Sequence, residues 1–324
     1  MERSTFTAGR IAADNSKMRP SSVIAPLLAV AVIAFSRVPL AAADDPSWDL
    51  DLGAARLHEL VPQLMDLAAH TDGLVALSIG DLRTGHAIAI NGGVNLPAAS
   101  TIKIPVMVEV FRQMAAGRFT DDRTVMLLDR DRDCGYGSLC DAPWGTEYRV
   151  GDLLARMIDV SDNTATNMLI RLVGRSSINA TMSGLGLSQT RLGDSIRSDG
   201  DIRVLRTSAD DMLRLLSLIA ARRVVDPQAS DEMLALLAGQ RHNTLLPALL
   251  PKGLVVAHKT GTLHDTLNDV GIVELAGAPY VICAFSTHLD DLDNGERFIR
   301  RASLLTFESF RRTAIARADS NARL

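Results

Sequence analysis

The sequence predicts an α+β fold, with a five-stranded antiparallel sheet flanked by helices beside an all-helical subdomain. Strand-like apolar stretches occur near both ends of the chain, at 74–81, 86–91, 254–258, 267–274 and 280–286. The middle of the chain has helical spacing instead, which predicts helices at about 150–160, 163–173, 176–184, 208–221 and 229–238. Strands from both ends can share one sheet, so a site between sheet and helices would use residues from both regions.

Apolar residues at helical spacing also predict a helix at each end of the folded region. The first runs from about Leu50 and ends before Thr71-Asp-Gly73, and the last is expected at about 296–314. We therefore expect a sheet subdomain from about 50–98 and 252–315, and a helical subdomain from about 99–251. Together they make a single domain over 44–324.

Composition and charge exclude one class of function. The 324 residues are 47% hydrophobic and 22% charged, with a formal net charge of −4. This composition is typical of a globular protein, and no basic run provides the electrostatic footprint that nucleic-acid binding needs. We expect no nucleic-acid partner, no cofactor and a monomeric protein.

The N-terminus has the pattern of an export signal. Arg19 precedes an apolar stretch from Val23 to Phe35, and small residues follow at Ala41 to Ala43. The alternative, a membrane anchor, is disfavoured because the stretch is short for a span and ends at Arg37. Residues 1–43 are therefore predicted to be a signal peptide, with Met18 as an alternative start. We expect a periplasmic or secreted protein with no stable membrane span after cleavage.

The three cysteines divide into a predicted pair and a single thiol. Cys134 and Cys140 flank a short glycine-containing loop, so we expect them to form a disulfide in an exported protein. Cys283 lies in an apolar stretch, where a buried thiol acts as a small hydrophobic side chain. The cysteines and histidines have no metal-ligand spacing, and we expect no metal site.

One serine and one lysine lie three residues apart at the start of an apolar helix expected over 101–116. In Ser100-Thr-Ile-Lys103 the two side chains share a helical face, so the amine can accept the proton of an attacking hydroxyl. The positive end of the helix dipole and its free N–H groups would stabilise an oxyanion. The structural alternative is that Ser100 only caps the helix.

Two further motifs follow in the chain. Ser161-Asp-Asn163 falls between two predicted helices, and Lys259-Thr-Gly261 is expected at the end of a strand. Taken singly, the first could be a helix cap and the second an ordinary strand end. Their combination with Ser100 and Lys103, in this order, is the signature of class A β-lactamases and penicillin-binding proteins.

From about residue 50 to 315 the chain resembles a class A β-lactamase. Tyr136 precedes Ser161 by 25 residues, as the gate tyrosine does in that family, and residues 145–154 resemble the usual approach to the second motif. The resemblance implies a β-lactamase/transpeptidase-like fold. It implies that Ser100 is the nucleophile, Lys103 its partner, and Ser161 the hydroxyl that relays a proton to the leaving nitrogen.

The resemblance also implies the substrate contacts. Asn163 would orient Lys103 and the substrate amide, and Tyr136 would gate the cleft. The substrate carboxylate would lie in a pocket formed by Lys259, Thr260, Gly261 and Thr262.

Two departures from the family concern release of the acyl group and binding of the carboxylate. Class A enzymes carry a glutamate about 36 residues after the second motif, which activates the deacylating water, whereas Thr190 to Thr207 contains no glutamate. The available groups are Asp194, Asp199, Asp201, or Lys103 acting twice. In addition, Leu263 to Gly271 contains no arginine to help hold the carboxylate, and neither His264 nor Asn268 replaces one.

Side chains alternate along a strand, so His258 is expected to point away from Lys259 and to be structural.

Three functions remain open on these residues. The first is a β-lactamase that hydrolyses its own acyl-enzyme, and the second a D-alanyl-D-alanine peptidase acting on cell-wall peptides. The third is a penicillin-binding sensor with little turnover, against which the intact Ser100, Lys103, Ser161 and Lys259 argue.

Overall fold

A computed structural model describes residues 30–31, 47–198 and 204–321 of the chain. The predicted signal peptide therefore lies outside the described residues, apart from the short strand β1 (Val30–Ala31). None of the described helices is long and apolar enough to cross a membrane.

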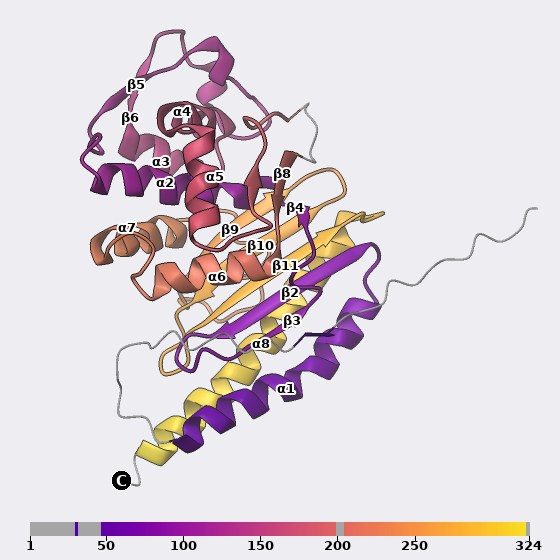
Figure 1. The fold of residues 1–324 in the computed structure, drawn as a ribbon. Helices are drawn as coiled ribbons and strands as arrows, with labels where there is room; N and C mark the ends of the chain where they lie inside the picture. The colour runs from indigo at the N-terminus through magenta and orange to yellow at the C-terminus, as the bar shows by residue number, and fades with distance from the viewer. Residues whose placement is uncertain (1–29, 32–46, 199–203, 322–324) are drawn as a thin grey trace, which may run out of the picture.

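The predicted antiparallel sheet is present and joins the two ends of the folded chain (Figure 1). Its strands follow the order β3 (Ala87–Ile90), β2 (Leu74–Asp81), β11 (Tyr280–Thr287), β10 (Leu267–Val273) and β9 (Val256–Thr262). Strand β1 pairs with the free edge of β3 as a two-residue addition. The N-terminal hairpin thus meets the C-terminal strands through the pairing of β2 with β11.

Two long helices cover one face of this sheet. Helices α1 (Ser47–Ala69) and α8 (Leu292–Asn321) lie side by side against it (Figure 1). The apolar side chains between them and the strands form one of two buried clusters, which includes Tyr280 stacked on Phe310. Both helices are longer than the sequence pattern predicts, because that pattern follows buried positions and the ends of α8 turn polar and exposed.

The predicted helical region lies on the other side of the sheet. Its helices are α2 (Lys103–Ala115), α3 (Val150–Asp159), α4 (Asn163–Val173), α5 (Arg175–Gly184), α6 (Ala209–Ala220) and α7 (Pro227–Ala238). Helix α6 contacts β2 and β11, and α7 contacts β9, so the second buried cluster extends from the sheet into the helices. Helix α2 contributes six apolar side chains to this cluster, and the buried Lys103 at its start reaches the site: the six are Ile104, Val106, Met107, Val108, Val110 and Phe111.

The motif Lys259-Thr-Gly261 lies at the end of a strand, as predicted, but the structure corrects the strand itself, which the sequence predicted only over 254–258. Strand β9 continues through the motif to Thr262, which pairs with Leu267 of β10. The apolar pattern stops at His258 because the next side chains are polar, although they remain buried in the ladder.

The fold also contains short strands that the sequence did not predict: β4 (Leu96–Pro97), β5 (Thr124–Met126), β6 (Glu147–Arg149), β7 (Arg191–Leu192) and β8 (Leu205–Thr207). Two or three residues are too few to show a period of two.

Candidate active site

Ser100 lies in a strained turn that is pressed against strand β9. It belongs to a 3-10 helix, η1 (Ala99–Ile102), that runs directly into α2, and Ala99 has a left-handed φ of 47°. A Cβ on Gly261 would lie 3.0 Å from Ala99 Cβ and 3.1 Å from Ser100 N, so only glycine lets the strand approach this closely. Asn268 of β10 fixes the turn further by donating to Pro97 O at 3.0 Å.

The capping alternative for Ser100 fails. Position N-cap of η1 is Ala98, no side chain caps that helix, and Thr101 Oγ1 donates to Ala98 O at 2.7 Å. Ser100 instead is half-buried and lines a cavity of about 460 Å³ together with Tyr136, Asn163 and Thr262. A volume of this size suits a small-molecule substrate.

Lys103 is fully buried beneath Ser100 and is held by the second motif. Its Nζ donates to Ser161 O at 2.6 Å and to Asn163 Oδ1 at 2.7 Å, and lies 3.0 Å from Ser161 Oγ. Burial, followed by the charge of Lys259, lowers the pKa of Lys103 well below its ordinary value. The amine is therefore prepared to accept a proton at neutral pH.

Lys259, on strand β9 of the sheet, also contacts Ser161. Its Nζ donates to Ser161 Oγ at 3.1 Å and to Thr260 O at 3.1 Å. Burial lowers the pKa of Lys259 to about 7. Ser161 itself has a left-handed φ of 60°, and its hydroxyl joins the two lysines in one hydrogen-bonded chain.

Asp162, between the two polar residues of this motif, has the structural role that the cap interpretation predicts. Its carboxylate accepts from Ala165 N at 2.8 Å and so caps α4. It also accepts from Ser138 N and Leu139 N, at 2.9 and 3.0 Å. The helix cap therefore ties the motif to the loop that carries Tyr136.

That loop is closed by the predicted disulfide. Cys134 and Cys140 are bonded, and Cys283 is free and buried, as expected. Tyr136 projects from the loop with 42% of its surface exposed, while its backbone O accepts from Asn163 N at 3.0 Å. The tyrosine side chain is free to contact a ligand although its backbone is fixed.

Asp133 is a site residue that the sequence did not reveal. Its Oδ1 accepts from Asn163 Nδ2 at 2.7 Å, and its two oxygens accept from Ser198 N at 2.6 Å and Ser198 Oγ at 2.5 Å. Burial alone would raise the pKa of Asp133, but the hydrogen bonds from Ser198 and Asn163 outweigh it and lower the pKa. The carboxylate orients the Asn163 amide so that its oxygen faces Lys103. No motif or spacing marks this residue, which only precedes Cys134.

The loop opposite Ser100 offers little chemistry for water activation. Asp194 lines the cleft, but its side chain is 68% exposed and lies 3.6 Å from Arg175. Ile196, whose backbone N and O are both bonded to the Asn167 side chain, also lines this wall, but its side chain is buried in the second apolar cluster. Asp199 and Asp201 lie outside the described residues.

The other end of the cleft is lined by hydroxyls, one histidine and one carboxylate. Thr260, Thr262 and Thr244 line it together with His242 and with Glu296 of α8. Burial, and then the charge of Lys259, lowers the pKa of His242. His264 is 76% exposed and faces Asp265, and Asn268 is bound to the Ser100 turn, so neither stands in for the missing arginine.

His258 points away from Lys259, as predicted, into a buried polar group. Its Nδ1 lies 2.9 Å from Asp269 Oδ1, and its Nε2 lies 3.0 Å from Asn243 Oδ1. Asp269 also accepts from Leu246 N at 3.0 Å. The pair thus fastens the segment that carries His242 and Thr244 to the sheet.

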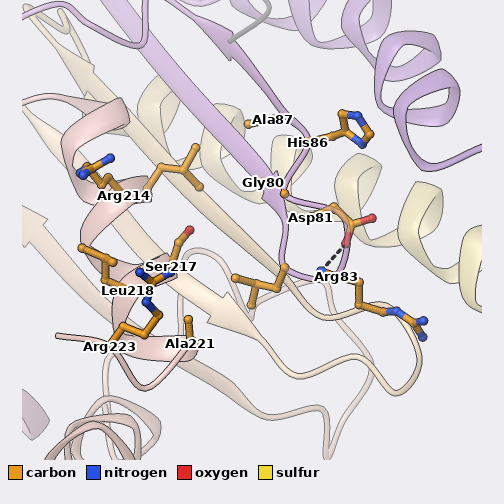
Figure 2. A pocket seen from close by; sticks show the side chains of 13 residues that line it. Gly80, Asp81, Arg83, His86, Ala87, Arg214, Ser217, Leu218, Ala221 and Arg223 are labelled. Carbon is orange, nitrogen blue, oxygen red and sulfur yellow. Dashed lines mark hydrogen bonds between the residues drawn. The ribbon is translucent and has the colours of Figure 1, made fainter. Parts of the chain in front are cut away.

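A second cavity lies elsewhere and shares no lining residue with the cleft. It encloses about 160 Å³ between the β2–β3 hairpin and α6, and is lined by Gly80, Arg83, Arg214 and Ser217 among others (Figure 2). Its hairpin turn is fixed by the bond from Arg83 N to Asp81 Oδ1, drawn in Figure 2. It is too small for most substrates and has none of the groups described above.

Comparison with known proteins agrees with this geometry. A family model described as the β-lactamase enzyme family matches residues 59–310. The chain belongs to this family. The structure of PBP-A is 30% identical in sequence over 79% of this chain and 97% of PBP-A, with a TM-score of 0.74. A leucine-to-glutamate variant of PBP-A is known as its acyl-enzyme complex with penicillin G.

Two β-lactamases are similarly close. The enzyme from Sphaerobacter thermophilus is 29% identical, with a TM-score of 0.73, over 78% of this chain and 96% of that one. An ancestral class A β-lactamase is 26% identical, with a TM-score of 0.70, over 77% of this chain and 99% of that one. The predicted β-lactamase/transpeptidase-like fold is confirmed.

Proposed function

We propose that this member of the β-lactamase family is a serine hydrolase that β-lactams acylate on Ser100, and that it hydrolyses the resulting ester slowly. The observation that carries the proposal is the chain of hydrogen bonds from Lys103 through Ser161 to Lys259 beneath the cleft that Ser100 lines. A protein that only bound a ligand would not need a buried amine with a lowered pKa beside a serine.

Acylation uses these groups in sequence. Ser100 Oγ attacks the lactam carbonyl carbon while its proton passes to the neutral amine of Lys103. Ser161 then gives its proton to the lactam nitrogen as the C–N bond breaks, and regains one from Lys103. Lys103 bonds to Ser161 and Asn163 in the free protein, and catalytic hydrogen bonds often tighten only when the substrate binds.

Substrate binding would use both sides of the cleft. The substrate carboxylate would lie against Lys259, Thr260 and Thr262, held by the lysine in its charged form. The amide side chain would meet Asn163 and the exposed ring of Tyr136. Gly261 lets strand β9 come close to the Ser100 N–H, which would donate to the oxyanion.

Release of the acyl group lacks an obvious base. An ester in this cleft faces Ile196 and the exposed Asp194, so the water must be activated by Lys103 or by one of the loop aspartates. A well-placed base contributes about 10² to 10⁴ in rate. Without one, the acyl-enzyme should accumulate.

A D-alanyl-D-alanine peptidase is the second candidate. The absence of a glutamate between Thr190 and Thr207 favours it, because a peptidase does not depend on that glutamate to release its acyl group. Release of D-alanine from a synthetic peptide ending in D-alanyl-D-alanine, at a rate above that of penicillin turnover, would select this candidate.

The nucleophile is tested by labelling with a fluorescent penicillin. Wild type should take up one equivalent, and Ser100→Ala should take up none. Ser188→Ala, which removes an exposed serine outside the cleft, is the control and should label like wild type. Equal labelling of the Ser100→Ala variant would move the nucleophile elsewhere.

We also propose export, with cleavage after Ala43, and a monomeric mature protein. The small residues at Ala41 to Ala43 and the apolar stretch before them support cleavage. Such cleavage would remove β1, so the sheet would end at β3. N-terminal sequencing of the secreted protein should begin at Asp44; a mature chain beginning before residue 36 would reject this site.

A further inference from the structure

A carboxylate lines the end of the cleft where the substrate carboxylate is expected. Glu296 of α8 borders the same cavity as Ser100, Ser161, Thr260 and Thr262. This is an unusual group to find there, because a negative charge repels an anionic substrate. The Glu296 carboxylate would be favourable only for a substrate whose charges differ from those of a simple penicillin.

The glutamate is held in place by an arginine of the same helix. Glu296 forms an ion pair with Arg300 one turn later, and their side chains are 30% and 35% exposed. Arg300 Nε also donates to Thr244 O at 2.6 Å, which fixes the guanidinium. Arg300 lines a separate surface groove beside α1, whereas Glu296 lines the cleft, so the pair turns its negative end towards the substrate.

The other residues lining this cavity do not balance that charge. Burial and the nearby lysine lower the pKa of His242, which disfavours its charged form. The remaining lining side chains carry hydroxyls or are aliphatic: Ser100, Tyr136, Ser161, Thr244, Leu245, Thr260, Thr262, Leu267 and Leu292. Lys259 lies beneath them and is fully buried. Among the described residues that line this cavity, Glu296 is thus the one that carries a full charge, and its partner Arg300 lies outside the lining.

We propose that Glu296 is a specificity-determining residue that favours β-lactams carrying a cationic group next to their carboxylate. In cephalosporins the ring carbon bearing the carboxylate is bonded to the carbon that bears the C3 substituent. With the carboxylate against Lys259 and the two threonines, that substituent reaches the outer end of the cavity and Glu296. This inference rests on the proposed function, since it assumes acylation of Ser100 by β-lactams.

Two cephalosporins provide a matched pair of probes. Cephaloridine and cephalothin share the same thienylacetamido side chain, but the C3 substituent carries a pyridinium cation in the first and a neutral acetoxy group in the second. The measurement is the ratio of their acylation rate constants, obtained by competition with a fluorescent penicillin. Comparing this ratio between variants cancels the intrinsic reactivity of the two compounds.

Glu296→Gln should lower the cephaloridine-to-cephalothin ratio about fivefold, the size expected for one part-exposed charge pair. Arg300→Gln should raise the ratio, because it leaves the carboxylate uncompensated; a purely structural role of the pair would not give opposite signs. The control is Glu308→Gln, which removes the same charge from α8 about 18 Å further along the helix and should leave the ratio unchanged.

The outcomes separate this inference from the proposed function. Acylation of wild type by neither cephalosporin nor penicillin would overturn the proposed function and this inference with it. Normal acylation with a ratio that changes in neither Glu296→Gln nor Arg300→Gln would overturn the inference alone. If thermal melting shows that Glu296→Gln is unfolded, the Arg300→Gln ratio decides, since a rise supports the inference and no change overturns it.

Discussion

The two walls of the Ser100 cleft differ in how much chemistry they carry. The wall with Lys103, Ser161 and Lys259 is buried and joined by hydrogen bonds of 2.6 to 3.1 Å, which fix the protonation and position of each group. The described part of the facing wall, residues 194–198, contains the largely buried Ile196 and the exposed carboxylate of Asp194. On the proposed function, nucleophile activation uses the first wall, whereas the described residues of the second wall hold no comparable buried base for the deacylating water.

The largest expected effect comes from removing the base on the buried wall. Lys103→Ala should lower the acylation rate constant by about 10²- to 10⁴-fold, because the Ser100 hydroxyl loses the amine that accepts its proton. Stopped-flow measurement with a chromogenic cephalosporin gives the constant. Lys252→Ala removes an exposed lysine and should behave like wild type. A loss of less than tenfold in Lys103→Ala would assign the base to another group.

Adding a base to the facing wall should give it a group that can activate the deacylating water. Ile196 lies 35 residues after Ser161, and its backbone is held by Asn167 at the edge of the cleft. Its own side chain is buried in the apolar cluster, where a carboxylate would be unfavourable, so a glutamate there should turn towards the cleft. Ile196→Glu should speed release of the penicilloyl group by about 10²-fold. Ile196→Gln has the same size without a base and should leave release unchanged. Equal rates in both variants would show that this position does not face the ester.

The pH dependence sharpens the role of the second lysine. Lys259 has a lowered pKa of about 7, so its charge is present below that pH and is lost above it. The acylation constant for penicillin should therefore fall by up to about tenfold per pH unit above pH 7, because the substrate carboxylate loses its partner. Lys259→Gln should be slow and lack this limb, while Lys252→Gln should retain it. The same limb in Lys259→Gln would exclude Lys259 as its source.

The smallest effect concerns the loop that carries Tyr136. Replacing Cys134 and Cys140 by serine should lower the free energy of unfolding by about 2 kcal/mol, because the short loop loses only a small constraint on the unfolded chain. Urea unfolding of the non-reduced proteins measures this difference. Wild type should show a single reactive thiol, Cys283, after denaturation without reductant. Three reactive thiols would mean that the bridge does not form in the protein.

The sequence predicted those parts of the molecule that repeat a pattern. Alternating and helical apolar spacing located the main strands and helices, and three motifs located Ser100, Ser161 and Lys259. It did not locate groups that depend on tertiary contact alone. Asp133 meets Ser198 from 65 residues away, and Glu296 reaches the cleft from the far end of the chain, with no local pattern to mark either.

The boundary of strand β9 was missed for a related reason. The ladder between β9 and β10 buries polar side chains up to Thr260, and alternation of apolar residues cannot show burial of polar ones. Polar residues are buried there because they are hydrogen-bonded within the site, as Lys259 is to Ser161. At the functional site, the pattern of apolar residues in the sequence therefore does not indicate which residues are buried.

The contrast between the two walls is tested most directly by mass spectrometry of the intact protein during reaction with penicillin G. We expect the mass of one penicilloyl group to appear rapidly and to persist after excess penicillin is removed, in wild type but not in Ser100→Ala. Rapid penicillin turnover without an accumulating adduct, surviving replacement of Asp194, Asp199 and Asp201 by asparagine, would contradict it, because another group would then activate the deacylating water efficiently.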